Sequence, residues 1–197
     1  MKILLGSQSP RRRELLAGLD VDFRVVAIDA DEHYPEGLQG GEIPYFISRA
    51  KAEAYSEPLA EDEILLTADT IVWVSGEGER GGVMLGKPKD EEEARGMLLL
   101  LSGRMHEVYT GVTIRTHDGM QTIVDKTEVW FRALSKEEID HYVERYKPLD
   151  KAGAYGVQEW IGYVGVTKIV GSYFNVMGLP VERVWEILSN LKNKGLC

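Results

Sequence analysis

Short apolar runs of β type alternate along this chain with segments that carry clear helix starts. This alternation constrains the fold, because it favours an α/β domain over a helix bundle or a β-sandwich. Apolar spacing, capping residues and turn residues place the expected elements. In chain order they are a strand at 3–5, a helix from 10, a strand at 23–28, a helix at 43–56, a strand at 64–74, a glycine-rich turn at 76–82, a helix at 90–101, a β-hairpin at 108–132, a helix at 135–146, a shaped loop at 149–158, a β-rich run at 163–170 and a final helix after 180.

Length, charge and cysteine content narrow the class of protein further. The 197 residues suffice for one large domain, or for a domain with a second lobe. A formal net charge of −9 argues against a nucleic-acid polymer as partner, since such binding needs an extended basic surface. The apolar run near Met1 is too short for a signal peptide or a membrane span, so no membrane partner is expected. The single cysteine, Cys197, excludes an internal disulfide and fits a reducing cytoplasm.

Three consecutive arginines, residues 11–13, stand at the start of the first expected helix, directly after a serine and a proline that suit its cap and first turn. Each cation there costs about 0.3 to 1 kcal/mol, because the helix dipole already favours anions. We therefore expect a phosphate to offset this charge, so that Arg12 matters for binding and not for the stability of the empty protein. The alternative is a solvated basic turn paired to Glu14 and Asp20. The residues expected to bind phosphate are Ser7, Ser9, Arg12 and Arg13.

An aspartate, Asp69, interrupts the apolar run at 64–74. A buried carboxylate needs a cation, a metal ion or a role as general base, because an unpaired buried charge is costly. The alternative is a purely structural role, in which backbone N–H groups alone satisfy the Asp69 carboxylate. Asp31 and Glu32, in the acidic stretch that follows the strand expected at 23–28, could add oxygen ligands for Mg²⁺ or Mn²⁺, although acidic loops are usually just solvated.

Two lysines, Lys51 and Lys87, could neutralise phosphate charge, with a solvent-facing role as the alternative for each. Lys87 ends a Gly-x-x-x-x-Gly-Lys sequence, but Pro88 stands where a P-loop needs a hydroxyl and a helix N–H. A P-loop kinase or ATPase is therefore excluded. The chain contains no Gly-x-Ser-x-Gly motif, and its four histidines lack metal or triad spacing. We interpret His106 as a structural, hydrogen-bonded residue.

A series of motifs recurs in order over nearly the whole chain and together resembles the Maf family, nucleoside triphosphate pyrophosphatases first named for septum formation inhibition. The motifs are Gly-Ser-Gln-Ser-Pro-Arg-Arg-Arg-Glu-Leu-Leu at 6–16, Ala-Asp-Thr at 68–70, Gly-Lys-Pro at 86–88, Ser-Gly at 102–103 with His106 and Thr-Gly at 110–111, Pro-Leu-Asp-Lys-Ala-Gly-Ala-Tyr-Gly-Val-Gln at 148–158, and Gly-Ser at 171–172 before Gly-Leu-Pro at 178–180. The resemblance implies one domain over residues 1–197 with a mixed twisted sheet flanked by helices. It also implies two lobes with a cleft, as in the inosine triphosphate pyrophosphatases.

The resemblance implies a reaction as well. Water attacks the α-phosphorus of a nucleoside triphosphate and yields the monophosphate and pyrophosphate, with a divalent metal cation, Mg²⁺ or Mn²⁺, as cofactor. Asp69 is implied as proton acceptor and metal ligand, and Glu32 as a second acidic residue near the metal. The residues implied to contact phosphate are Ser9, Arg12, Lys51, Lys87 and Lys151, and those implied to select the substrate are Arg11, Thr70 and Gln158.

At the three selective positions this chain resembles the members that act on dTTP and UTP. Members acting on 7-methyl-GTP tend to carry tryptophan after the proline, glutamine at the position of Thr70 and glutamate at that of Gln158. The neutral amide of Gln158 suits the uracil or thymine edge, which presents one N–H donor between two carbonyl acceptors. Several alternatives stay open. The substrate could be a modified pyrimidine nucleotide or 7-methyl-GTP, and the function could be that of a nucleotide kinase or of a non-catalytic nucleotide sensor that inhibits septum formation. A homodimer is a possible assembly.

Overall fold

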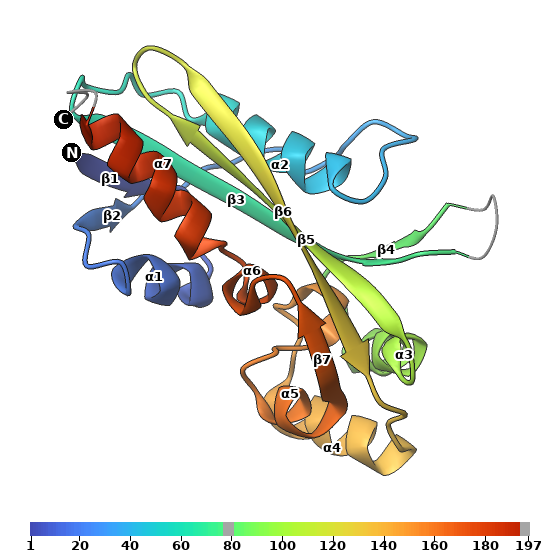
Figure 1. Ribbon diagram of the computed structural model, residues 1–197. Coiled ribbons are helices and arrows are strands. Elements are labelled where there is room, and N and C mark those ends of the chain that lie inside the picture. Colours follow the sequence, from blue (N-terminus) through green and yellow to red (C-terminus); the bar gives the residue numbers. More distant parts are fainter. Residues whose placement is uncertain (77–80, 194–197) are drawn as a thin grey trace. The chain divides into compact units, whose positions relative to one another are not determined.

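The computed structural model in Figure 1 describes residues 1–76 and 81–193. Most of the glycine-rich turn expected at 76–82, and Cys197, lie outside these residues. No described helix is both long and apolar enough to cross a membrane. The elements are β1 (Lys2–Leu5), α1 (Pro10–Ala17), β2 (Phe23–Val25), α2 (Glu42–Ala54), β3 (Glu63–Val74), β4 (Val83–Leu85), α3 (Glu91–Leu101), β5 (Met105–Arg115), β6 (Met120–Phe131), α4 (Lys136–Tyr146), the 3₁₀ helix η1 (Ala152–Ala154), α5 (Trp160–Gly165), β7 (Val166–Val170), α6 (Tyr173–Met177) and α7 (Val181–Asn193).

The described strands form one mixed sheet. Its order is β2-β1-β3-β5-β6-β7, with β4 paired to β3 outside this path. Strand β1 runs parallel to β2 and β3, whereas β4 is antiparallel to β3 and β7 is antiparallel to β6. Helices flank the strands (Figure 1). The expected α/β class, a mixed sheet flanked by helices, is confirmed.

The chain divides into two compact units. Unit 1 comprises Met1–Asp69, Thr110–Asp125 and the segment that begins at Gly178, and unit 2 comprises Thr70–Tyr109 and Lys126–Met177. Strands β3, β5 and β6 contribute residues to both units. The two units agree with the two expected lobes, while the cleft and the treatment of residues 1–197 as one domain stay predictions.

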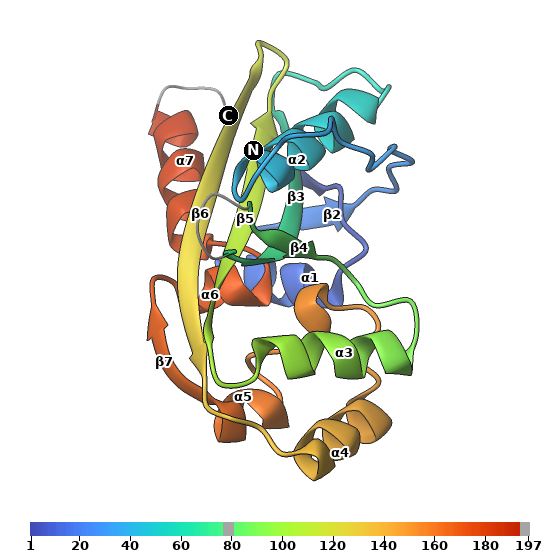
Figure 2. The same cartoon turned by 90° about the vertical axis from the view of Figure 1, so that its right-hand side faces the viewer.

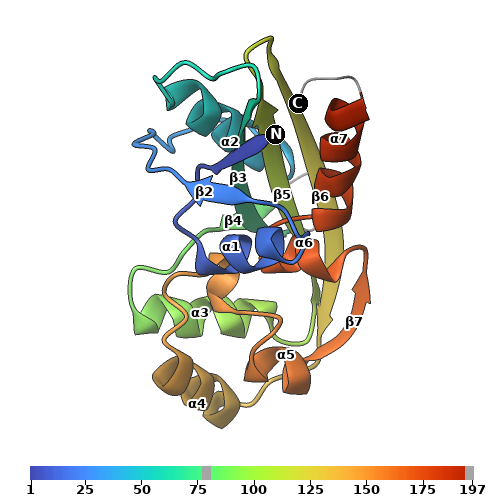
Figure 3. The ribbon, with the colours of Figure 1, turned by 90° about the vertical axis from the view of Figure 1, so that its left-hand side faces the viewer.

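The core of unit 1 forms where β1 and β3 pair and α2 covers them. Leu4 lies opposite Leu65 in the parallel ladder, and both pack with Ala52 and Tyr55. Because side chains alternate along a strand, the neighbours of these leucines point to the other face. Figure 3 shows α2 and α7 on opposite sides of the unit 1 strands. Unit 1 is therefore a sheet covered by helices on both faces.

The core of unit 2 contains α3 and α4, which lie side by side (Figure 2). Both helices begin at the caps expected from the sequence. Asp90 accepts a hydrogen bond from the backbone N–H of Glu93, and Ser135 and Glu138 form a complete capping box. Helix α4 carries the fully buried Tyr142 into the core.

Two expected elements differ from the structure, and one further helix was not expected. The strand expected at 23–28 is only β2 (Phe23–Val25), because its parallel partner β1 ends at Leu5 and offers no further ladder. The first three residues of the β-rich run expected at 163–170 belong to the end of helix α5 (Trp160–Gly165), and only Val166–Val170 forms β7, paired with β6. Helix α6 was not expected at all. Its five residues follow Ser172, whose hydroxyl accepts a hydrogen bond from the backbone N–H of Asn175 at 3.3 Å.

Candidate functional site

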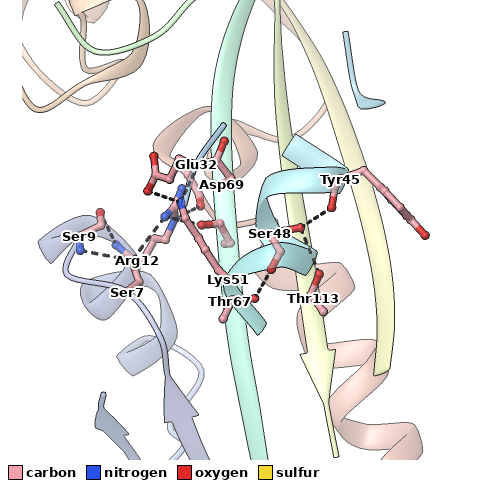
Figure 4. Close-up of polar contacts among 12 residues, drawn as sticks. Ser7, Ser9, Arg12, Glu32, Tyr45, Ser48, Lys51, Thr67, Asp69 and Thr113 are labelled. Atoms are coloured by element: carbon pink, nitrogen blue, oxygen red, sulfur yellow. Dashed lines mark hydrogen bonds and ion pairs between the residues drawn. The ribbon is translucent and has the colours of Figure 1, made fainter. Parts of the chain in front are cut away.

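The start of α1 has the geometry that the sequence predicts. Ser9 is the N-cap, its Oγ accepts a hydrogen bond from the backbone N–H of Arg12 at 3.4 Å, and Pro10 occupies the first helical turn. Ser7 is buried just before the helix, and its Oγ accepts from the backbone N–H of Ser9 at 3.3 Å. Figure 4 shows Ser7, Ser9 and Arg12 grouped together, with Asp69 beside them. This capped helix start, within unit 1, therefore has the local geometry that anions favour, while the phosphate-binding role of its residues stays a prediction.

The Arg12 side chain has protein partners that the sequence did not predict. Its Nε donates to the carbonyl oxygen of Gly178 at 2.8 Å, and its Nη1 donates to that of Ala68 at 2.9 Å and to Ser7 Oγ at 3.4 Å. Burial lowers the pKa of the Arg12 guanidinium below its ordinary value, and the nearby carboxylate of Asp69 partly offsets this effect. The expectation that Arg12 is tolerated only because of a bound phosphate is thus wrong. Backbone carbonyls already hold it.

This geometry predicts that Arg12→Ala destabilises the protein even without a ligand. Hydrogen bonds from a charged donor are worth about 1.5 to 3 kcal/mol, so we expect a loss of about 2 kcal/mol. That corresponds to a fall in Tm of roughly 4–8 °C for a chain of this size. The measurement is a thermal melt of the empty protein.

The adjacent residue provides a matched control. Arg13 is exposed, and the structure gives it a hydrogen bond from Nη2 to the carbonyl oxygen of Gln8 at 3.1 Å. Arg13→Ala should therefore change Tm little, as surface substitutions usually do. Equal Tm values for Arg12→Ala and the unsubstituted protein would contradict the role of Arg12 as a structural clamp.

Asp69 lies in a polar cluster on β3. Asp69 and Thr70 are the two half-buried positions within an otherwise buried stretch from Ile64 to Val74. The Nζ of Lys51, on α2, lies 2.8 Å from Asp69 Oδ1 and 3.0 Å from Glu32 Oε1 (Figure 4). The Lys51 and Asp69 side chains are only 13% and 14% exposed, so their ion pair is largely shielded from solvent. The cation partner expected for Asp69 is therefore Lys51.

Two carboxylates, from Asp69 and Glu32, converge on the Lys51 ammonium, and carboxylate oxygens are donors of the kind that divalent cations prefer. Mg²⁺ commonly uses one or two protein carboxylates and completes its coordination with phosphate oxygens and water. Within residues 1–76 and 81–193, no group of three or more histidine, cysteine or acidic side chains is arranged to hold a metal ion. The two carboxylates are donors of the chemical type that Mg²⁺ and Mn²⁺ bind, but they are too few to hold such an ion without further ligands.

The loop after α4, in unit 2, contains Lys151 and Gln158. Lys151 is buried, and its Nζ lies 2.8 Å from Asp150 Oδ1 and 3.1 Å from Glu159 Oε1. The Oε1 atom of Gln158 is buried and has no hydrogen-bond partner in the part of the chain that the structure describes. Sequence reasoning missed Glu159. The available signal was a carboxylate directly after Gln158 and just before a helix start.

The remaining candidate residues have different surroundings. Lys87 is exposed two residues after the end of β4, and the next helix, α3, begins four residues later at Glu91, so the geometry of a P-loop is absent there. Arg11 and Thr70 are half-buried. Their selective role, like the phosphate-binding role of Lys87 and Lys151, stays a prediction.

His106 is a structural residue, as interpreted from the sequence. It is fully buried in unit 2, and its Nε2 lies 2.8 Å from the hydroxyl of Tyr155. The rings of His106, Tyr155 and Phe131 pack edge to face, with centroids 5.0 to 5.4 Å apart. Burial lowers the pKa of His106 to about 3, so the ring is neutral at physiological pH. This aromatic cluster anchors the loop three residues before Gln158.

Comparisons with known proteins agree over nearly the full length. A family model described as "Maf-like protein" matches residues 2–191. A protein named dTTP/UTP pyrophosphatase from Parabacteroides distasonis is 53% identical over 190 residues, covering 96% of this chain and 95% of the relative. Proteins of the same name from Bacteroides fragilis and Flavobacterium johnsoniae are 51% and 47% identical. The first covers 96% of both chains, and the second covers 96% of this chain and 95% of the relative.

A solved structure is also similar, at a lower level. It is a nucleoside-triphosphatase, dITP/XTP pyrophosphatase, from Mycobacterium abscessus, with 15% identity and a TM-score of 0.40. The match covers 75% of this chain and 96% of that chain.

Proposed function

This chain belongs to the Maf family, and on that premise we propose that it is a hydrolase that converts dTTP and UTP to the monophosphate and pyrophosphate. The observation that carries the proposal is the cluster in unit 1, where Asp69 and Glu32 share Lys51 beside the start of α1. Carboxylates, an ammonium group and helix N–H groups in one place suit the cleavage of a phosphoanhydride. The named activity of the relatives points to the same reaction.

In the proposed mechanism, Asp69 acts as the general base. Its carboxylate accepts a proton from a water molecule while the water oxygen forms a bond to the α-phosphorus. The bond from the α-phosphorus to the bridging oxygen then breaks, and pyrophosphate leaves with that oxygen. Lys51 offsets the negative charge of both carboxylates, so a polyanionic substrate can approach them. The residues proposed to bind phosphate are Ser7, Ser9, Arg12, Arg13, Lys51 and Lys87.

Asp69 and Glu32 are proposed to hold a divalent cation, Mg²⁺ or Mn²⁺. When bound, the cation would neutralise phosphate charge and polarise the phosphoryl oxygen. The convergence of the two carboxylates within about 3 Å of one ammonium nitrogen supports this assignment. The phosphate-binding role inferred for Lys151 is the least supported, because two carboxylates already contact its ammonium.

Substrate choice is assigned to Gln158, Thr70 and Arg11. The buried Oε1 of Gln158 lacks a donor among the described residues, and the N–H of a uracil or thymine edge would supply one. A pyrimidine triphosphate, modified or not, is therefore favoured over 7-methyl-GTP. A cytoplasmic location fits a nucleotide substrate and a single cysteine. A homodimer is compatible with this proposal, and neither a nucleic-acid polymer nor a membrane is required as partner.

The proposal predicts the products and a metal requirement. Purified protein with dTTP or UTP should release monophosphate and pyrophosphate in equal amounts, only when Mg²⁺ or Mn²⁺ is present. Chromatography of the nucleotides together with a pyrophosphate assay measures both. Diphosphate and orthophosphate as main products would overturn the assigned bond. Tight nucleotide binding without turnover would instead support the non-catalytic sensor, and transfer of phosphate to a second nucleotide would support a kinase.

A further inference from the structure

The span from Gly156 to Glu159, which presents Gln158, is fixed at both ends by a buried polar network. The hydroxyl of Tyr142, on α4, donates to Glu159 Oε2 and accepts from the backbone N–H of Gly156 at 3.0 Å. Glu159 also forms an ion pair with Lys151, whose Nζ lies 3.1 Å from Glu159 Oε1. One carboxylate therefore joins a helix and the two ends of the loop.

The packing around this carboxylate leaves little room for other arrangements. A Cβ atom at Gly156 would lie 2.9 Å from Glu159 Cδ and 3.1 Å from Lys151 Cε, so any larger residue there would have to displace the two side chains of the ion pair. Tyr142 is fully buried, and Lys151 and Glu159 are only 9% and 21% exposed. Burial and the adjacent Glu159 carboxylate raise the pKa of Tyr142, so its hydroxyl stays a donor. The network is thus shielded, and each member has a defined partner.

Within this fixed span, the Gln158 side chain differs from its two neighbours in its hydrogen bonding. Val157 is buried in the core and Glu159 is held by Tyr142 and Lys151, so both neighbours of Gln158 are immobilised. The Oε1 of Gln158 is nevertheless without a partner among the described residues. The conformational entropy of ordering this span is therefore lost on folding and not on ligand binding, and the Oε1 of Gln158 stays available as an acceptor for the ligand.

From this juxtaposition we propose that Glu159 is a positioning residue for base recognition, which acts by holding Gln158 in a single orientation through Tyr142 and Lys151. The proposal rests on the proposed function of Gln158 as the residue that contacts the base. It assigns Lys151 to the same positioning network. Loss of the network should therefore weaken discrimination between bases more than the chemical step.

The test variant is Glu159→Gln, which keeps the size and one oxygen acceptor but loses the ion pair with Lys151. A misplacement of about 1 Å can cost about 100-fold, so we expect the ratio of kcat/KM for dTTP to that for GTP to fall about 10- to 100-fold. The change should lie mainly in KM for dTTP, with kcat altered less. Tyr142→Phe, which removes the shared hydroxyl, should change the same ratio in the same direction.

Glu138→Gln is the matched control. Glu138 lies in the same unit, is 28% exposed, and loses a comparable ion pair, with Arg132 at 2.7 Å, when it is substituted. The Glu138→Gln substitution should lower Tm without changing the ratio of kcat/KM for dTTP to that for GTP. If Glu159→Gln lowers Tm but leaves that ratio unchanged, Glu159 has only a structural role and the inference is overturned. If the unsubstituted protein shows no preference for dTTP over GTP, the proposed function itself fails, and the two failures are distinguishable.

Discussion

Asp69→Asn is expected to lower kcat for dTTP by about 10² to 10⁴-fold, the usual cost of losing a general base. The amide keeps the size of the side chain and an oxygen that can accept from Lys51, so the fold should be retained. It cannot take a proton from water at neutral pH. Steady-state kinetics with saturating metal ion measure the loss, and circular dichroism checks the fold.

Asp62→Asn is the control for this substitution. Asp62 lies directly before the same strand, β3, and its ion pair with Lys2 is exposed at the surface. Exposed pairs contribute little, so activity and stability should both stay close to those of the unsubstituted protein. Turnover by a folded Asp69→Asn protein at more than about a tenth of the normal rate would remove Asp69 from the role of base, since even the weakest general bases contribute about 10²-fold.

Local signals in the sequence predicted the parts of the site that depend on a few neighbouring residues. Ser9 and Pro10 specified the start of α1, because capping geometry involves only one helical turn. Asp69 and Thr70 could be recognised because two polar residues interrupt an apolar strand. His106 could be interpreted as structural because none of the four histidines has metal or triad spacing in the sequence.

Contacts between distant segments could not be predicted in this way. Arg12 donates to the carbonyl of Gly178, which lies 166 positions later, and no sequence pattern specifies an acceptor on the backbone. Lys51 and Asp69 are 18 positions apart on a helix and a strand, so their ion pair depends on how α2 packs on β3. Helix α5 was not predicted, and its Gly162 approaches the backbone carbonyl of Val157 too closely for any side chain, a contact that no local sequence pattern specifies.

Gln158→Glu is expected to give the largest change in substrate preference. The substitution replaces an NH₂ donor by a second acceptor facing a pyrimidine carbonyl, and it places a carboxylate next to Glu159. A site built for one hydrogen-bond pattern leaves buried polar groups unpaired when the pattern is wrong, which can amount to a factor of about 10⁴ in kcat/KM. We expect a loss approaching this size for dTTP and UTP, and a much smaller effect on guanine nucleotides. Competition assays with mixed nucleotides measure the ratio directly.

Gln121→Glu makes the same chemical change at an exposed position in unit 1 and should leave the ratio of dTTP to GTP turnover unchanged. The comparison is internal to one enzyme, so errors in active protein concentration cancel. An equal loss for all nucleotides would mean that Gln158 supports the loop or the chemical step, because a base contact must distinguish bases. A preference of the unsubstituted protein for guanine nucleotides would exclude pyrimidine recognition, since the neutral amide would then face adjacent donors that a carboxylate suits better.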